Sequence, residues 1–422
     1  MISELKIRNF KSLESVDLKL GHFNLLVGAN ASGKSNFLDA LRFLQGVGNG
    51  FNIGEILDGK PSSSTTLKWD GIRGGSSSIG FLKTSGEQTK TIKFEVTFGD
   101  ENLRLLMGAD LKYCLTCSTG VSNLFFTNES LSCGEDFLPL GAYTNSAVEP
   151  NASVPPSHSP FPKRISSALI TKELPRFDFS TIRTLIEIDK DRTQTWGSGR
   201  AAGCALHIST SLADIQFLDL LPTALRNYST KVAQLGEGGE GFAALIHEIE
   251  SNGSKPALLE WLKELRPDEV DDIYALEGLN NDFMVAIKEG NKEFRAPSIS
   301  DGTLRFIALA ATFFQPMMPK ILVIEEIEKG LHPSRLRLLL ELMRSQSKRT
   351  GTQVFATTHS PTLLAWLTEE DRKTTFVCTR DAESGATKMR SLAEIPRFEE
   401  LIEEGSHIDE LFAEGWLESA PQ

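Results

Sequence analysis

The residues whose types and spacing most directly indicate chemistry are two glycines and the Lys-Ser pair behind them. Gly28 and Gly33 stand in the pattern GxxxxGKS, which Lys34 and Ser35 complete. Glycines let the backbone curl so that successive N–H groups face a β- or γ-phosphate, and a helix that begins at Lys34 points the positive end of its dipole there. Lys34 supplies a charge for the phosphates, and the Ser35 hydroxyl is a ligand for Mg²⁺.

The sequence around this stretch predicts the elements that must position it. Residues 23–27 are an apolar strand candidate, and residues 34–44 place apolar side chains on one helix face. An ordinary glycine-rich turn is the alternative, but it does not require these flanking elements. We therefore predict a phosphate-binding loop over residues 28–35, with the nucleotide held by Gly28, Asn30, Ser32, Gly33, Lys34, Ser35 and Asn36.

A second apolar strand, at residues 321–324, ends in the carboxylates Glu325 and Glu326. At the carboxyl end of a parallel strand, side chains face the crevice in which α/β sheets bind ligands. We predict that Glu325 holds Mg²⁺ or its water and that Glu326 is the general base that activates water for attack on a γ-phosphate. A charged strand end without chemistry is the alternative, and the phosphate-binding loop in the same chain disfavours it.

Two shorter patterns complete the set of candidate residues. The strand candidate at 353–358 ends in His359, and Pro361 then suits the first turn of a helix. A histidine at that position can hydrogen-bond a γ-phosphate or the attacking water, although an isolated one is more often structural. Ser300 is a candidate cap for a helix whose N-terminus can bind an anion, which is a weak signal by itself.

Composition restricts the class of protein. The chain has 422 residues, 40% of them hydrophobic and 24% charged, as in soluble globular proteins of two or three structural units. No apolar run approaches the roughly 18 residues that span a bilayer, so we expect no membrane partner and a cytoplasmic location. The net charge of −12 does not favour nucleic acid as a partner, although a local basic groove is compatible with it.

The five cysteines are an odd number scattered through a long chain, which argues against a disulfide framework. Cys114 and Cys117 form the one CxxC pattern, within a strand candidate. Residues three apart on a strand point to opposite faces, so this pair is not expected to hold a metal ion.

The order of elements predicts an α/β protein with insertions. Alternating residues at 2–7, 14–20, 91–98, 111–116 and 123–126 predict strands. Apolar residues spaced three and four apart predict helices at 223–228, 241–250 and 256–265. We divide the chain into a discontinuous core at 1–48 and 291–422, an antiparallel β lobe at 49–140, a Pro- and Ser-rich loop at 141–165 and a mostly helical insertion at 166–290.

Together and in this order, the motifs resemble the ABC-type ATPase heads of the RecF, SMC and OLD group. Residues 5–13 resemble the N-terminal strand signature of that group, and residues 28–35 its Walker A loop, with Ala31 where glycine is commoner. Residues 300–304 match the signature motif, residues 325–333 Walker B plus the D-loop, and residues 358–360 the switch histidine. The resemblance covers roughly the first 50 and the last 130 residues. It implies an α/β fold, an ABC-type P-loop ATPase head with an inserted antiparallel β lobe and a helical insertion.

The resemblance also implies ATP and Mg²⁺ as cofactors and a homodimer that sandwiches ATP. The signature residues Ser300, Asp301, Gly302 and Thr303 of one subunit would contact the ATP bound by Lys34 of the partner subunit. Glu325 replaces the usual Walker B aspartate, as in OLD-type members, and Ile327 the usual proline, so hydrolysis is expected but could be slow. Gln216 is the candidate for the Q-loop glutamine near the metal.

Three functions follow from these patterns. The first is an ATP-gated switch for a separately encoded effector, a nuclease or another toxin, in antiphage defence or DNA repair, and its biological role rests on analogy alone. The second is a RecF-like sensor of DNA ends or DNA structure. The third is a small-molecule phosphotransferase, which leaves residues 300–304 and His359 without roles. A built-in Toprim nuclease and long coiled-coil arms are not expected, because the stretch after Ser360 is too short and the middle of the chain lacks heptads.

Overall fold

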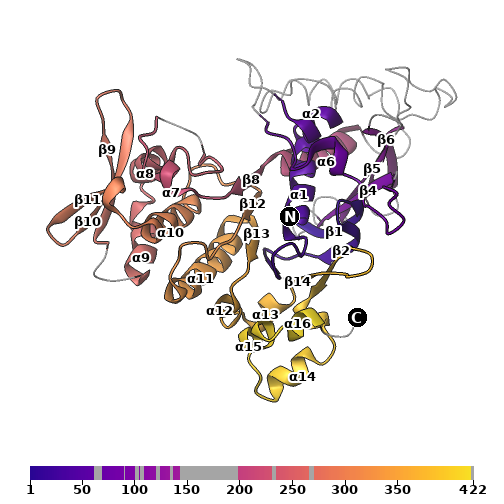
Figure 1. The fold of residues 1–422 in the computed structure, drawn as a ribbon. Helices are drawn as coiled ribbons and strands as arrows, with labels where there is room; N and C mark the ends of the chain where they lie inside the picture. The colour runs from indigo at the N-terminus through magenta and orange to yellow at the C-terminus, as the bar shows by residue number, and fades with distance from the viewer. Residues whose placement is uncertain are drawn as a thin grey trace. The chain divides into compact units, whose positions relative to one another are not determined.

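The computed structural model describes residues 1–60, 69–89, 91–99, 104, 109–119, 124–133, 136–142, 198–230, 234–265 and 270–419. The chain forms two compact units (Figure 1). The first consists of Met1–Gly21, Ala29–Ile215 and Cys378–Arg390, and the second of His22–Gly28, Gln216–Val377 and Ser391–Gln422. None of the helices in the described ranges is both long and apolar enough to cross a membrane.

The first unit contains an antiparallel sheet with the strand order β2-β1-β4-β5-β6-β7. Its strands have the bounds β1 Ile2–Phe10, β2 Leu13–Lys19, β4 Thr91–Phe98, β5 Leu111–Thr119, β6 Leu124–Cys133 and β7 Asp136–Ala142. In β4, buried and accessible residues alternate along the strand, which is the pattern of a sheet with one face in a core. The strands predicted for the antiparallel lobe are present as β4, β5 and β6, and the same sheet also contains β1 and β2, which the sequence analysis assigned to the core.

Among the described residues, the helices of the first unit are α1 Lys34–Gly48, α2 Ile53–Asp58, α6 Ser198–Ala213 and the short 3₁₀ helix η1 Gly75–Ser78. Helix α1 packs against an aromatic cluster. Phe43 of α1 stacks on Phe94 of β4 with ring centroids 5.1 Å apart, and Phe10 meets both rings edge-on. These contacts fix α1, the helix behind the phosphate-binding loop, to β1 and β4.

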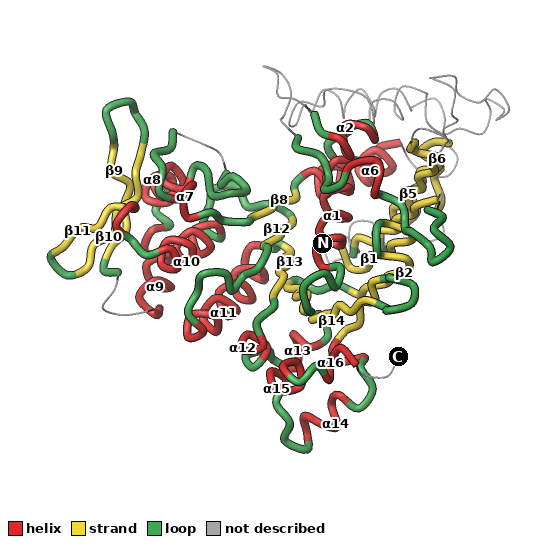
Figure 2. Tube along the Cα trace, in the orientation of Figure 1, coloured by secondary structure: helices red, strands yellow, loops and turns green. Residues whose placement is uncertain are grey.

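A second sheet has the strand order β15-β14-β3-β13-β12-β8, and in it β14, β3, β13 and β12, which belong mostly to the second unit, pair in parallel (Figure 2). The bounds are β3 Phe23–Val27, β8 Ile215–Leu218, β12 Ile321–Ile324, β13 Gln353–Thr358 and β14 Thr375–Arg380. All residues of β3, β12 and β13 are buried, as expected for strands covered on both faces. The end of β14 and most of β15 (Thr387–Ser391) belong to the first unit, which contains Cys378–Arg390, while Ser391 belongs to the second.

Helices and a small antiparallel sheet complete the second unit. The sheet has the order β11-β10-β9, with bounds β9 Asp272–Glu277, β10 Phe283–Glu289 and β11 Lys292–Arg295. The longer helices are α8 Phe242–Ser251, α9 Lys255–Leu265, α10 Asp301–Thr312 and α11 Pro333–Thr350. Shorter ones are α7 Pro222–Leu225, α12 Pro361–Leu364, α13 Glu369–Arg372, α14 Phe398–Glu403, α15 Ile408–Ala413, α16 Trp416–Ser419 and the 3₁₀ turns η2 Ala296–Ser298 and η3 Leu392–Glu394.

The structure agrees with most predicted elements and changes the extent of some. The helices predicted at 241–250 and 256–265 are present as α8 and α9, whereas the one predicted at 223–228 ends at Leu225. The segment predicted to be mostly helical, 166–290, also contains β9 and β10, and its part before Ser198 lies outside the described residues. The predicted loop at 141–165 begins inside β7 and otherwise lies outside them.

The strand that holds the CxxC pattern is confirmed. Cys114 lies opposite Glu95 in the register of β4 and β5, and Cys117 lies opposite Ile92. Cys117 is buried while Cys114 is partly accessible, as expected for residues on opposite faces of a strand. All five cysteines are free thiols.

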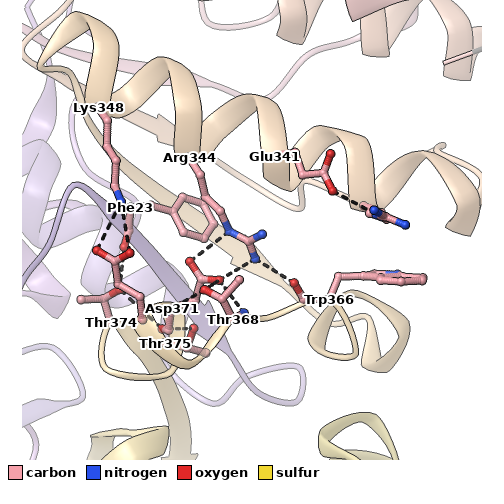
Figure 3. A network of polar contacts seen from close by, with 11 residues as sticks. Phe23, Glu341, Arg344, Lys348, Trp366, Thr368, Asp371, Thr374 and Thr375 are labelled. Carbon is pink, nitrogen blue, oxygen red and sulfur yellow. Dashed lines mark hydrogen bonds and ion pairs between the residues drawn. The ribbon is translucent and has the colours of Figure 1, made fainter. Parts of the chain in front are cut away.

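Helix α11 is held in place by a network around Asp371 of α13 (Figure 3). Arg344 of α11 donates from Nε to Asp371 at 3.0 Å and from a terminal nitrogen to the carbonyl of Trp366 at 2.8 Å. Thr368 donates its hydroxyl to the same carboxylate, and Thr374 bonds the carbonyl of Phe23 in β3. The Arg344 and Asp371 side chains are only 19% and 7% exposed, so this pair fixes α11 more firmly than a surface ion pair does.

Candidate functional site

Two residues of the phosphate-binding loop (residues 28–35), Ala31 and Gly33, have a positive φ, which favours glycine. Gly33 has φ 108° and is the N-cap of α1, with no side chain capping the helix. Ala31 has φ 63°, a conformation that glycine adopts without strain. Glycine is commoner at this position in the Walker A loops that the chain resembles, and this φ gives the physical reason.

Lys34 is buried against its own loop. It is 5% exposed, and its Nζ donates to the carbonyl of Ala29 at 2.9 Å and lies 3.4 Å from Oγ of Ser32. Asn30 and Ser35 are exposed. The loop is therefore already curled around the lysine, with the Ser35 side chain open to solvent at the first turn of α1.

Two polar side chains far apart in the sequence support this loop within the first unit. Thr387 of β15 donates its hydroxyl to the carbonyl of Ser32 at 3.1 Å, and its oxygen lies 2.6 Å from the hydroxyl of Ser12. Asn36 donates to that Ser12 hydroxyl at 2.6 Å. A Cβ on Gly33 would overlap the Thr387 side chain. Ser12 belongs to the N-terminal signature, but no sequence signal marks Thr387.

A buried carboxylate joins α1 to two other segments of the first unit. Asp39 is 2% exposed and accepts from Lys11 at 2.6 Å and from Nε of Arg73 at 3.1 Å. Arg73 also donates to the carbonyl of Ser35 at 3.0 Å. The sequence patterns did not single out Asp39 or Arg73.

In the second unit, the parallel register brings the carboxyl ends of three strands to one edge of the sheet. Val27, the last residue of β3, pairs with Thr358 of β13, and Ile324 of β12 pairs with Ala356. Gly28 begins the phosphate-binding loop directly after Val27. Ligand crevices of α/β sheets lie at such an edge.

The predicted general base and switch histidine are neighbours at this edge. Nε2 of His359 lies 3.9 Å from Oε1 of Glu326, and both side chains are partly exposed. Glu326 has a positive φ of 47°, an uncommon conformation for a non-glycine residue. Its N–H donates to Oγ1 of Thr357 at 2.9 Å, which holds the residue in that turn. The structure thus brings Glu326 and His359 together in a strained turn, as functional sites often do.

Ser300 caps α10, as the sequence predicted. Its hydroxyl accepts from the N–H of Thr303 at 3.2 Å. Each of the next three residues has a specific neighbour: Asp301 pairs with Arg226 at 2.5 Å, Thr303 accepts from Arg335 at 3.2 Å, and a Cβ on Gly302 would overlap the carbonyl of Gly330. The signature segment is therefore held against the D-loop of its own chain.

Arg305 connects α10 to the turn after β12. It is 2% exposed and donates to the carbonyls of Leu220, Glu325 and Glu326 at 2.8, 3.1 and 3.0 Å. Burial lowers the pKa of this guanidinium, and the acidic groups of Asp219, Glu326 and Glu328 act in the opposite direction. Two of these bonds tie the backbone of Glu325 and Glu326 to α10, and the third ties α10 to Leu220.

Gln216 uses both ends of its side-chain amide within the protein. Its Oε1 accepts from Gln315 at 2.9 Å, and its Nε2 donates to the carbonyl of Leu235 at 2.7 Å. These two bonds orient the amide and leave its oxygen one further lone pair for a ligand.

Two family models match the chain. One, described as an AAA ATPase domain, matches residues 1–116. The other, described as an AAA domain, putative AbiEii toxin, Type IV TA system, matches residues 236–365. The first match includes the phosphate-binding loop, and the second includes residues 300–303, Glu326 and His359.

Known relatives are distant along the full chain and closer over a short stretch. An "ATP/GTP phosphatase" of Helicobacter pylori is 22% identical over 395 residues, which cover 89% of this chain and 90% of the relative. The DNA replication and repair proteins RecF of Glaesserella parasuis and Pasteurella multocida are 50% and 52% identical over 44 residues, about 10% of this chain and 12% of theirs.

Among solved structures, the SMC head bound to the C-terminal winged-helix domain of ScpA aligns with a TM-score of 0.50 at 14% identity, over 93% of this chain and 98% of that one. The SMC head domain from Thermotoga maritima aligns with a TM-score of 0.46 at 13% identity, over 92% and 98% of the two chains. The family models and the RecF matches support an ATPase of the RecF-like AAA kind, and the alignment with the SMC head shows the fold of an ABC-type P-loop ATPase head. This confirms the class and the fold that the order of the motifs predicted.

Proposed function

We propose that this chain is an ATP-hydrolysing switch. Two copies close around ATP and separate after hydrolysis, and this movement controls a separately encoded effector, a nuclease or another toxin, in antiphage defence or DNA repair. The proposal rests on one observation: Nε2 of His359 lies 3.9 Å from Oε1 of Glu326, at the sheet edge where the phosphate-binding loop begins. A carboxylate beside a histidine at this edge suits general-base activation of water next to a γ-phosphate.

Each predicted residue has a role in this proposal. Lys34 and the uncapped N-terminus of α1 bind the phosphates, helped by Gly28, Gly33 and the polar side chains of Asn30, Ser32 and Asn36. Glu326 accepts the proton of the attacking water, and His359 orients that water or the γ-phosphate. Ser35 and Glu325, with oxygen donors that suit Mg²⁺, would hold the ion, which supplies positive charge to the phosphates. Gln216 is its third candidate ligand.

The signature segment provides the contact between the two copies. Helix α10 presents its N-terminus, including Ser300 to Thr303, to the ATP held by the partner subunit's Lys34. Because this contact exists only in the closed dimer, ATP shifts the population toward that state and hydrolysis releases it. The description of the matching family model, "putative AbiEii toxin, Type IV TA system", is compatible with a role in a toxin system.

Removing the base while keeping nucleotide binding tests the switch. We expect Glu326→Gln to bind ATP, hydrolyse it at least about 100-fold more slowly and accumulate as a dimer. The measurements are phosphate release and light scattering after gel filtration in saturating Mg-ATP. Lys34→Ala combined with Glu326→Gln is the matched control, which should stay monomeric because it binds no nucleotide. A monomeric Glu326→Gln protein in saturating Mg-ATP would rule out the sandwich.

A second candidate function is suggested by the RecF relatives, whose name assigns them to DNA replication and repair. In this alternative the closed dimer binds DNA ends or DNA structures itself, under control of ATP. The two functions share the ATPase cycle and differ in what the closed dimer holds.

A further inference from the structure

A third carboxylate lies in the turn that follows β12, between the base and the D-loop. Oε1 of Glu328 accepts a hydrogen bond of 2.6 Å from the backbone N–H of His359. Its other oxygen, Oε2, is buried and has no hydrogen-bond partner among the described residues. A short bond from an amide to a charged acceptor is among the stronger hydrogen bonds of proteins.

The bond belongs to a set that ties this turn to the end of β13. The N–H of Glu326 donates to Oγ1 of Thr357 at 2.9 Å, and the N–H of Ile327 donates to the Thr357 carbonyl at 3.1 Å. Glu328 adds the contact to His359 itself. Three successive residues of the turn, Glu326, Ile327 and Glu328, therefore bond to residues at the end of β13 or just after it.

This arrangement determines how the histidine faces the base. The positive φ of Glu326 directs the turn, and the Glu328 bond fixes the backbone from which the imidazole projects to 3.9 Å from the Glu326 carboxylate. Without Glu328, the His359 N–H loses this acceptor, and the imidazole is no longer held beside the base. Stability alone does not favour a carboxylate here, since a buried oxygen without a partner costs free energy.

We propose that Glu328 is a positioning residue for ATP hydrolysis, which holds the switch histidine in register with the general base through the His359 N–H. The inference rests on the proposed function for its catalytic consequence, while the contact itself can be tested without it. Because Oε1 alone carries the contact, an amide oxygen can replace it. A glutamine should therefore rescue what an alanine removes.

The test compares Glu328→Ala, Glu328→Gln and a matched control, Glu341→Ala, which removes an exposed carboxylate from α11. Glu328→Ala should lower kcat about tenfold or more while the Kd for ATP stays within about twofold, and Glu328→Gln should keep most of the wild-type kcat. Glu341→Ala should resemble wild type. A Glu328→Ala protein with kcat within about twofold of wild type would overturn the inference, as would a Glu328→Gln protein as slow as the alanine variant.

Hydrogen exchange at the His359 amide separates this inference from the proposed function. Exchange should be faster in Glu328→Ala than in wild type and close to wild type in Glu328→Gln. If the wild-type protein hydrolyses no ATP, the proposed ATPase function fails, and exchange still decides whether Glu328 holds the switch segment. Unchanged exchange in Glu328→Ala would overturn the contact, whatever the hydrolysis rate.

Discussion

At the scale of single residues, Gly33 is required for two separate reasons. Its φ is 108°, and a Cβ there would overlap the Thr387 side chain. We expect Gly33→Ala to destabilise the first unit by about 2–4 kcal/mol and to weaken ATP binding, because the phosphate-binding loop must move away from Thr387. Thermal unfolding and calorimetric titration with ATP measure the two effects.

The double variant with Thr387→Ala separates the two causes. It removes the two nearest Thr387 atoms, Oγ1 and Cγ2, but leaves Cβ, which would lie 2.8 Å from the new Cβ, and it leaves the unfavourable φ, so it should recover part of the lost stability and not all of it. Thr387→Ala alone is the control, since it deletes only the support of the loop. If the double variant recovered all of the lost stability, the positive φ at position 33 would carry no free-energy cost for alanine, contrary to our expectation.

Residue types could be predicted from sequence where a motif fixes their spacing. The GxxxxGKS pattern and the strand-terminal Glu326 and His359 were found because local sequence encodes them. Thr387 and Asp39 were not, because their contacts join segments distant in the chain. The left-handed φ of Glu326 was also not predictable, since it depends on a hydrogen bond to a neighbouring strand.

At the scale of elements, Asp39 holds α1 to the turn between β1 and β2 and to the loop that carries Arg73. The side chains of Asp39 and Lys11 are 3% and 7% exposed, so the pair is buried, whereas the Arg73 side chain is 54% exposed. We expect Asp39→Asn to lower the free energy of unfolding by about 3 kcal/mol, because Lys11 keeps its buried charge without a counterion. Denaturant unfolding measures this change.

The exposed ion pair Arg337–Glu341 provides the control for this prediction. Both of its side chains are more than 40% exposed, so Glu341→Gln should change the free energy of unfolding by less than about 0.5 kcal/mol. Equal effects of the two substitutions would contradict the buried role of Asp39.

Elements with a clear period were predicted well, and those shaped by tertiary packing were not. Strand β4 was predicted with the bounds it has, because its alternation is regular and one face is buried. Helix α7 is shorter than its apolar pattern indicated, and β9 and β10 pair antiparallel inside a segment expected to be mostly helical. A hairpin gains its stability from the cross-strand pairs that its fold creates, so residue spacing along one strand gives a weak signal.

At the scale of the whole molecule, charge separates the effector switch from the DNA sensor. The net charge of −12 repels the phosphate backbone, and the proposed dimer would carry twice that charge. If the chain acts on a protein effector, we expect no measurable binding of a short DNA duplex at about 0.15 M salt, with or without ATP. Fluorescence anisotropy of a labelled duplex with the Glu326→Gln dimer measures this, and Lys34→Ala is the control that cannot close around ATP. Binding that requires ATP and weakens steeply as salt rises would instead show a basic groove in the closed dimer, and the RecF-like function would replace the effector switch.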